Sequence, residues 1–324
     1  MAVPVATIID RAGRIIEMKA TPAFQFDAAF DSFLILHENG SDNHTLTLVL
    51  KLHLNKVSPM SVPLPFLGRV TLPFADADGT LFAIKPWTTT DFSCFTRQFL
   101  RQCAMWNDKF WLIPPAGFSG LDVKLGGRTV RPNIYCHLFV AIVGSAAGSH
   151  RTIDVVNLDR RTAARQLGKR ERDLNATDFR SHEGLYDSVD VKPVPIPFQD
   201  ETGTTHRLNR STIAHEVGHA LGLPHIGVAH SSPVCQVAII ADALLPTSIT
   251  TNPSFPALLS GSSNSMACYG HSGHLSLGAN IMGFGARFDA SNAQPWIDRI
   301  ALHTGIRKED WKASVGKRLP PKFL

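Results

Sequence analysis

Long apolar runs, a leader segment and a disulfide framework are all missing from this chain of 324 residues. No window approaches the roughly 18 uninterrupted apolar residues that a membrane-spanning helix needs. The N-terminus lacks a basic segment followed by an apolar run, so no signal peptide is evident. The five cysteines are an odd number, so at least one thiol is unpaired within the chain. These absences predict a chain that acts in the cytoplasm or is exported without a signal peptide, with no transmembrane segment.

A strong excess of one charge is also lacking, because the net charge is only +5. The hydrophobic fraction of 44% is that of an ordinary globular protein, and the chain is long enough to bury a sizeable core. Basic residues gather between positions 160 and 172, but acidic residues are interleaved with them. This pattern predicts a solvated face. We therefore expect no nucleic-acid partner.

The most informative segment that is present covers residues 215–225, which read H-E-x-x-H-x-x-G-x-x-H. His215 and His219 lie four positions apart, so on a helix they share a face and can hold one metal ion. Glu216 follows the first histidine and is placed to hold a water molecule. Gly222 can end the helix in a left-handed conformation, after which the chain turns and brings in His225. Three neutral histidines leave one tetrahedral position open for water, which is typical of a catalytic zinc site.

These eleven residues resemble the zinc signature of the metzincin clan of metallopeptidases, without indicating a family within the clan. That clan also carries a methionine-containing turn beneath the metal. The segment Asn280-Ile281-Met282-Gly283 resembles this turn, and the segment around Met266 is a rival. The resemblance implies a zinc endopeptidase that cleaves a protein substrate. His215, His219 and His225 would hold the ion, Glu216 would act as general base, and Met282 would lie under the ligands.

One position departs from the clan's pattern. Several metzincin families carry a tyrosine two residues after the turn methionine, where it helps to stabilise the oxyanion. This chain has Phe284 there, which cannot donate a hydrogen bond. Tyr269, His271 and His274 lie shortly before the turn and are the candidate substitutes, although each also fits the description of an ordinary loop residue.

The remaining pattern predicts an α+β fold. Residues 1–86 read as a small β-rich domain, in which residues 45–54 alternate as a half-buried strand should. A strong helix follows, with Phe92, Phe95 and Phe99 at helical spacing. We therefore expect a domain boundary near residue 86, a metzincin-like catalytic domain over 87–310 and a C-terminal tail over 311–324, in which residues 317–322 are loosely ordered. Residues 191–198 carry alternate prolines, which suit an exposed edge bordering the substrate cleft or a plain connecting loop.

Other functions also fit the histidine motif and the β-rich region. The zinc fold could be catalytically inert and serve, with the β-rich region, as a partner-recognition module, although an intact Glu216 argues against this. A zinc hydrolase of a non-peptide bond is a third reading. A peptidase without a leader fits an effector or toxin delivered by secretion machinery, and it equally fits a housekeeping cytosolic enzyme. An inhibitor or the N-terminal region would then restrain its activity.

Overall fold

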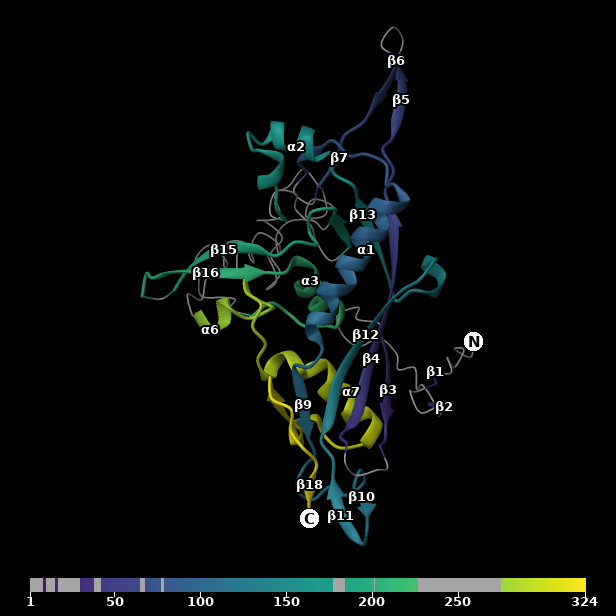
Figure 1. The fold of residues 1–324 in the computed structure, drawn as a ribbon, viewed down its shortest axis with the longest axis vertical. Coiled ribbons are helices and arrows are strands. Elements are labelled where there is room, and N and C mark those ends of the chain that lie inside the picture. The colour runs from purple at the N-terminus through teal and green to yellow at the C-terminus, as the bar shows by residue number, and fades with distance from the viewer. Residues whose placement is uncertain are drawn as a thin grey trace, which may run out of the picture.

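The computed structural model describes residues 30–37, 42–64, 68–76, 79–176, 184–200, 202–226 and 275–324. It also describes the backbone of two short strands, β1 (Ile8–Ile9) and β2 (Ile15–Ile16), which pair antiparallel. The chain has a mixed α+β fold in which a curved sheet runs along the long axis of the molecule (Figure 1). In the described ranges, none of the helices is long and apolar enough to cross a membrane.

The central sheet has the strand order β14-β13-β4-β12-β9-β17, and β3 pairs with β4 beside this path. The strands β4, β12, β13 and β14 run parallel to one another, whereas β3, β9 and β17 are antiparallel to their neighbours. The bounds are β3 Asp31–Ile35, β4 His44–Lys56, β9 Phe110–Ile113, β12 Ile134–Ile142, β13 Arg151–Val156, β14 Leu185–Asp187 and β17 Lys312–Val315.

The strand predicted at residues 45–54 lies at the centre of this sheet, and this corrects the expected domain boundary. β4 is flanked by β12 and β13, which come roughly 90 to 100 residues later in the chain. Leu46 and Leu48 belong to the same core as Phe95 and Phe99. Thr47 on the other face is buried as well, so the strand is not half-buried as predicted. The segments on either side of residue 86 therefore share one sheet and one core.

The C-terminal tail is also part of the fold, and residues 317–322, which we expected to be loosely ordered, make contacts as well: Asn43 and Asn133 donate to the carbonyl oxygens of Leu319 and Pro320. Trp311 is buried, and β17 directly after it pairs with β9. Strand β18 (Lys322–Phe323) then pairs with β11 (Arg128–Arg131), which in turn pairs with β10 (Val123–Leu125). The tail thus contributes strands to two sheets.

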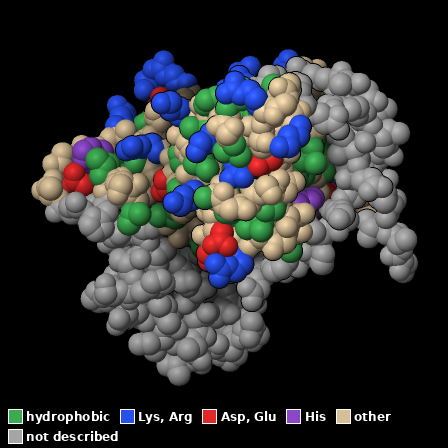
Figure 2. Space-filling view, turned by 90° about the horizontal axis from the view of Figure 1, so that it is seen from below, with side chains coloured by type: hydrophobic (Ala, Val, Ile, Leu, Met, Phe, Trp, Pro, Cys, Tyr) green, Lys and Arg blue, Asp and Glu red, His purple; other side chains and the backbone are tan. Residues whose placement is uncertain are grey.

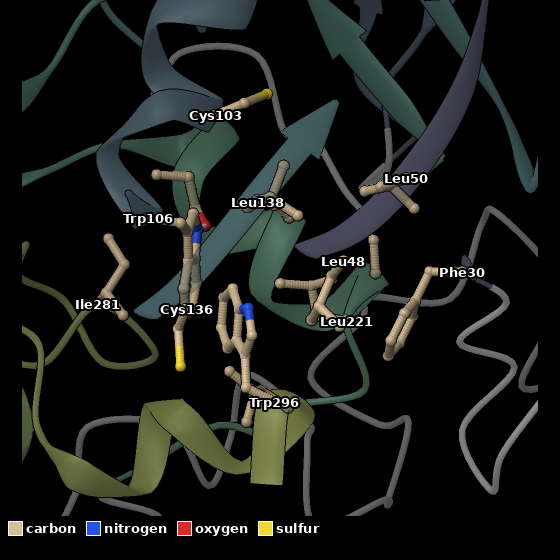
Figure 3. Close-up of a cluster of buried hydrophobic side chains, with 14 of the residues drawn as sticks. Phe30, Leu48, Leu50, Cys103, Trp106, Cys136, Leu138, Leu221, Ile281 and Trp296 are labelled. Atoms are coloured by element: carbon tan, nitrogen blue, oxygen red, sulfur yellow. Dashed lines mark hydrogen bonds between the residues drawn. The ribbon is translucent and has the colours of Figure 1, made fainter. Parts of the chain in front are cut away.

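Two helices cover the core beside the sheet. The predicted aromatic helix is α1 (Thr89–Cys103), which Thr88 caps by accepting a hydrogen bond from Asp91 N–H. Helix α7 (Gln294–Thr304) buries Trp296 completely. Trp106 and Trp296 stack with ring centroids 6.2 Å apart in the middle of this core (Figure 3).

The other elements are short or lie at the edges. They are the hairpin β5 (Ser61–Leu64) and β6 (Gly68–Thr71), the hairpin β7 (Phe74–Ala75) and β8 (Leu81–Phe82), helix α2 (Arg160–Gln166), the hairpin β15 (Val194–Gln199) and β16 (Thr205–Arg210), helix α3 (Thr212–Ala220) and helix α6 (Leu275–Gly278). Helix α3 carries the histidine motif. It lies beside α1, next to the β15–β16 hairpin (Figure 1).

Candidate metal centre

Helix α3 is anchored at its start by side-chain hydrogen bonds. Ser211 is its N-cap, because the Ser211 hydroxyl oxygen accepts a hydrogen bond from Ala214 N–H at 3.2 Å. The Trp106 indole N–H donates to the carbonyl oxygen of Ala214 at 2.9 Å, which ties the helix to the core behind it. Nearly every residue of α3 is buried, including His215 and Glu216. The first half of the motif is therefore held on a helix that solvent hardly reaches.

The helix ends as the sequence predicts. Gly222 has φ of 89°, the left-handed conformation that favours glycine. Gly222 N–H donates to the carbonyl oxygen of His219, and Leu223 N–H donates to that of Gly218, both at 2.9 Å. These two bonds define a Schellman motif, which closes the helix and reverses the chain. The reversal returns His225 to the face that carries His215 and His219.

The three histidines converge through their Nε2 atoms. His225 Nε2 lies 3.0 Å from His219 Nε2 and 3.2 Å from His215 Nε2. Zinc–nitrogen bonds of about 2.05 Å in a tetrahedron place the ligand atoms about 3.3 Å apart, so the separations fit a shared zinc ion. Within the described part of the chain, these are the residues whose ligand atoms gather closely enough for a metal.

Backbone carbonyl groups orient two of the rings. His215 Nδ1–H donates to the carbonyl oxygen of Ile281 at 2.7 Å, and His219 Nδ1–H donates to that of Leu223 at 2.8 Å. Each bond places the proton on Nδ1 and leaves the Nε2 lone pair directed at the common point. Such outer hydrogen bonds are the usual support of histidine metal ligands.

The electrostatic environment favours the neutral imidazole that a metal requires. Burial is the main cause that holds the pKa of His215 well below its ordinary value. The positive charge of Arg210 and the neighbouring rings of His219 and His225 lower it further. His215 is thus ready to bind a cation at neutral pH without first losing a proton.

Glu216 directly follows His215 on α3. Its carboxylate faces the guanidinium group of Arg210, a contact that the sequence pattern did not predict. Its Oε1 is 3.9 Å from a guanidinium nitrogen of Arg210, and only 8% of the Glu216 side chain is exposed. Arg210 ends strand β16, directly before the N-cap of α3. Nothing in the local sequence could have predicted this contact, because it depends on how the hairpin meets the helix.

The turn that carries Met282 lies directly behind helix α3, on which His215 and His219 lie. Met282 is fully buried, and a Cβ atom placed on Gly218 would overlap its Sδ atom. Ile226 N–H donates to the carbonyl oxygen of Met282 at 3.0 Å, and the Asn280 side chain accepts from Met282 N–H at 2.8 Å. The turn is therefore linked both to the helix and to the segment that carries His225.

Phe284 lies where the clan often has a tyrosine, and it packs against the hairpin. Its ring centroid is 6.2 Å from that of Phe198 on β15. The candidate donors Tyr269, His271 and His274 lie outside the described residues, as does the rival methionine, Met266. The oxyanion donor therefore stays a prediction.

The proline-containing segment before the helix forms a strand with exposed prolines. β15 pairs with β16 over residues 194–199, and both Pro195 and Pro197 are exposed. Within the described ranges β15 has no second partner strand, so of the two readings of this segment the structure shows the exposed edge and not the plain connecting loop that the sequence favoured. Whether a substrate lies along this hairpin is a separate prediction.

No protein-family model matches this chain, and neither a search of curated proteins nor one of solved structures found a match. The geometry of the three-histidine site is therefore the basis for any function of this chain.

Proposed function

We propose that this chain is a zinc-dependent endopeptidase with a metzincin-like catalytic site, which hydrolyses peptide bonds of a protein substrate. The observation that carries the proposal is the convergence of three Nε2 atoms at 3.0 and 3.2 Å, two of them oriented by backbone carbonyl groups. A structural zinc site would have four protein ligands, whereas three histidines leave a position for water.

His215, His219 and His225 would hold the zinc ion. When bound, zinc in such a site lowers the pKa of a water molecule to about 7 and polarises a carbonyl group. Glu216 would accept the proton of that water and pass it to the leaving amine of the cleaved peptide bond. A guanidinium nitrogen of Arg210 lies 3.9 Å from the Glu216 carboxylate and can help to position it. Met282 packs behind the ligands and is not itself a ligand.

Two settings are proposed for this activity: delivery as an effector or toxin, and a housekeeping role in the cytosol. Export of a tagged chain from its own cells separates them.

The test compares the wild type with Glu216→Gln and with a matched control, Glu309→Gln, which alters an exposed carboxylate outside the site. We expect all three chains to bind one zinc ion, measured by metal analysis. Each chain is then incubated with a whole-cell lysate, and new protein N-termini are sequenced. The wild type and Glu309→Gln should produce the same cuts, whereas Glu216→Gln should lose activity by roughly a hundredfold or more. Removal of the metal should stop cleavage, and added zinc should restore it.

Three outcomes contradict parts of the proposal. A wild type that binds no zinc would refute the metal centre. A zinc-loaded wild type that makes no cuts would favour the inert recognition module over the peptidase. Cleavage by Glu216→Gln at the wild-type rate would show that Glu216 is not the general base.

A further inference from the structure

A basic groove lies between helix α1 and the segment that leads into the hairpin beside the metal helix. Arg97, Gln98 and Arg101 line it from α1, and Val191 and Lys192 line it from the segment before β15. Its volume is about 530 Å³. Arg97 and Arg101 are one helical turn apart and exposed, so both guanidinium groups face the same side of α1.

The charge of this groove is not neutralised within the described part of the chain. Arg97, Arg101 and Lys192 form no ion pair there. Arg131, Arg170 and Arg307, in contrast, are each paired with an aspartate: Asp122, Asp173 and Asp310. On the predicted solvated face at residues 160–172, Arg170 and Arg172 thus have Asp173 as an ion-pair partner, whereas the groove cations have no such partner among the described residues.

The pKa of Lys192 lies below its ordinary value, first because partial burial disfavours the ammonium form and then because of the positive charge of Arg160. The face of the molecule seen from below carries Lys and Arg side chains among hydrophobic ones and a few acidic ones (Figure 2). A groove that gathers unpaired cations attracts an anionic ligand.

The groove is connected to the metal helix through Gln102. The Gln102 side-chain amide donates to the carbonyl oxygen of Val191 at 3.2 Å, and its oxygen accepts from the Ser211 hydroxyl at 2.5 Å. Ser211 is the N-cap of α3, and His215 lies about 6 Å further along that helix at 1.5 Å per residue. A ligand in the groove would therefore lie beside the start of the helix that holds the proposed metal.

The lining favours a peptide with acidic side chains. Arginine binds a carboxylate through two parallel hydrogen bonds, and two arginines one turn apart can hold neighbouring acidic residues. The amide of Gln98 offers both a donor and an acceptor for a peptide backbone. None of the lining residues that the structure describes is aromatic, so this lining offers no stacking platform of the kind on which nucleic-acid bases bind.

We propose that the basic groove binds an acidic segment of the protein substrate and anchors it beside the metal helix. The identification of this ligand as a substrate rests on the proposed peptidase function. The binding of an acidic segment does not rest on it, so the two can fail separately.

The test measures binding of a fluorescein-labelled oligoglutamate peptide by anisotropy, at low ionic strength, to the zinc-loaded full chain carrying Glu216→Gln. We expect saturable binding. In the same background, Arg97→Glu, Arg101→Glu and Lys192→Glu together should weaken it by roughly tenfold or more, because three attractive contacts become repulsive. The matched control reverses three exposed lysines outside the groove, Lys124→Glu, Lys317→Glu and Lys322→Glu, and should bind nearly as well as the parent chain.

The proposal is overturned if the peptide fails to bind, or if the groove variant and the control variant weaken binding equally. Tighter binding of single-stranded oligothymidylate than of oligoglutamate, lost in the groove variant, would assign the groove to nucleic acid instead. An inactive wild type with intact oligoglutamate binding would refute the peptidase and leave the groove as a site for an acidic partner.

Discussion

At the scale of single residues, Gly218 stands at a position that the histidine motif does not specify, yet it has a packing role. A Cβ atom at Gly218 would overlap the Sδ atom of Met282 and lie 3.0 Å from the ring of Trp106. Both neighbours are fully buried, so neither has free space to move into. The absence of a side chain is what allows the methionine turn to lie against the metal helix.

Gly218→Ala should therefore destabilise the protein although alanine is the better helix former. Overpacking typically costs about 1–3 kcal/mol, and the gain in helix propensity offsets about 1 kcal/mol of it. We expect a net loss of about 1 kcal/mol or more in the free energy of unfolding, measured by urea denaturation. Zinc affinity should fall as well, because a displaced Met282 disturbs the neighbouring carbonyl group that orients His215.

The control for this prediction is Gly148→Ala, at a glycine around which an added Cβ atom meets nothing within 4 Å. That change should leave zinc affinity unaltered. Equal zinc affinity in Gly218→Ala and the wild type would show that the contact between the helix and the turn does not support the ligands.

At the scale of elements, the start of α3 is the point where the groove, the helix and the metal ligands meet. Removing the Ser211 hydroxyl leaves the N–H group of Ala214 without its cap and leaves Gln102 without one partner. Ser211→Ala should cost about 1 kcal/mol of stability, as is usual for an N-cap. It should also weaken zinc binding, because His215 lies on the first turns of this helix.

Thr88→Ala provides the matched comparison, since Thr88 caps α1 by the same kind of bond. It should cost a similar free energy of unfolding and leave zinc affinity unchanged. Similar zinc affinities in the two variants, measured by competition with a chelator, would mean that the cap stabilises α3 without positioning His215.

The sequence predicted these elements well because their signals are local. The glycine at position 222 of the motif and the aromatic repeat of α1 each specify a helix end or a buried face within a few residues. Arg210 could not be predicted in the same way. It reaches Glu216 through the geometry of the β15–β16 hairpin, and the pattern of residues 205–210 does not reveal that geometry.

At the scale of the whole molecule, the sequence was least informative about which distant segments pair in one sheet and share one core. Parallel pairing joins β4 to β12 and β13, and such distant pairings leave no local signature. The alternation in β4 suggested an independent β-rich domain with one solvated face. The Thr47 face of β4 is instead covered, and Phe33 on β3 packs against Val49. The three converging histidines were predicted because their spacing alone brings them together.

A polar cluster ties this N-terminal part to the rest of the sheet, and it makes stability depend on acid. Asp31 on β3 accepts a hydrogen bond from Lys51 Nζ on β4 at 2.7 Å and lies 3.4 Å from His150 Nε2, just before β13. The hydrogen bond with His150, followed by that with Lys51, outweighs burial and lowers the pKa of Asp31 from 3.8 to about 2. The folded chain therefore holds this proton less tightly than the unfolded chain does.

The stability that follows from this shift should be fully present above about pH 4 and lost as the pH falls to about 2. A depression of nearly two units corresponds to about 2 kcal/mol at neutral pH. Asp31→Asn should cost about that much near neutrality and little near pH 2, measured by urea denaturation of the metal-free chain so that zinc release in acid does not contribute. Asp298→Asn, at an exposed carboxylate on α7, should cost little at any pH. If Asp31→Asn costs the same at neutral and acid pH, the cluster acts through packing rather than charge. In the expected case, the carboxylate holds β3, β4 and the segment before β13 together as one cooperative unit.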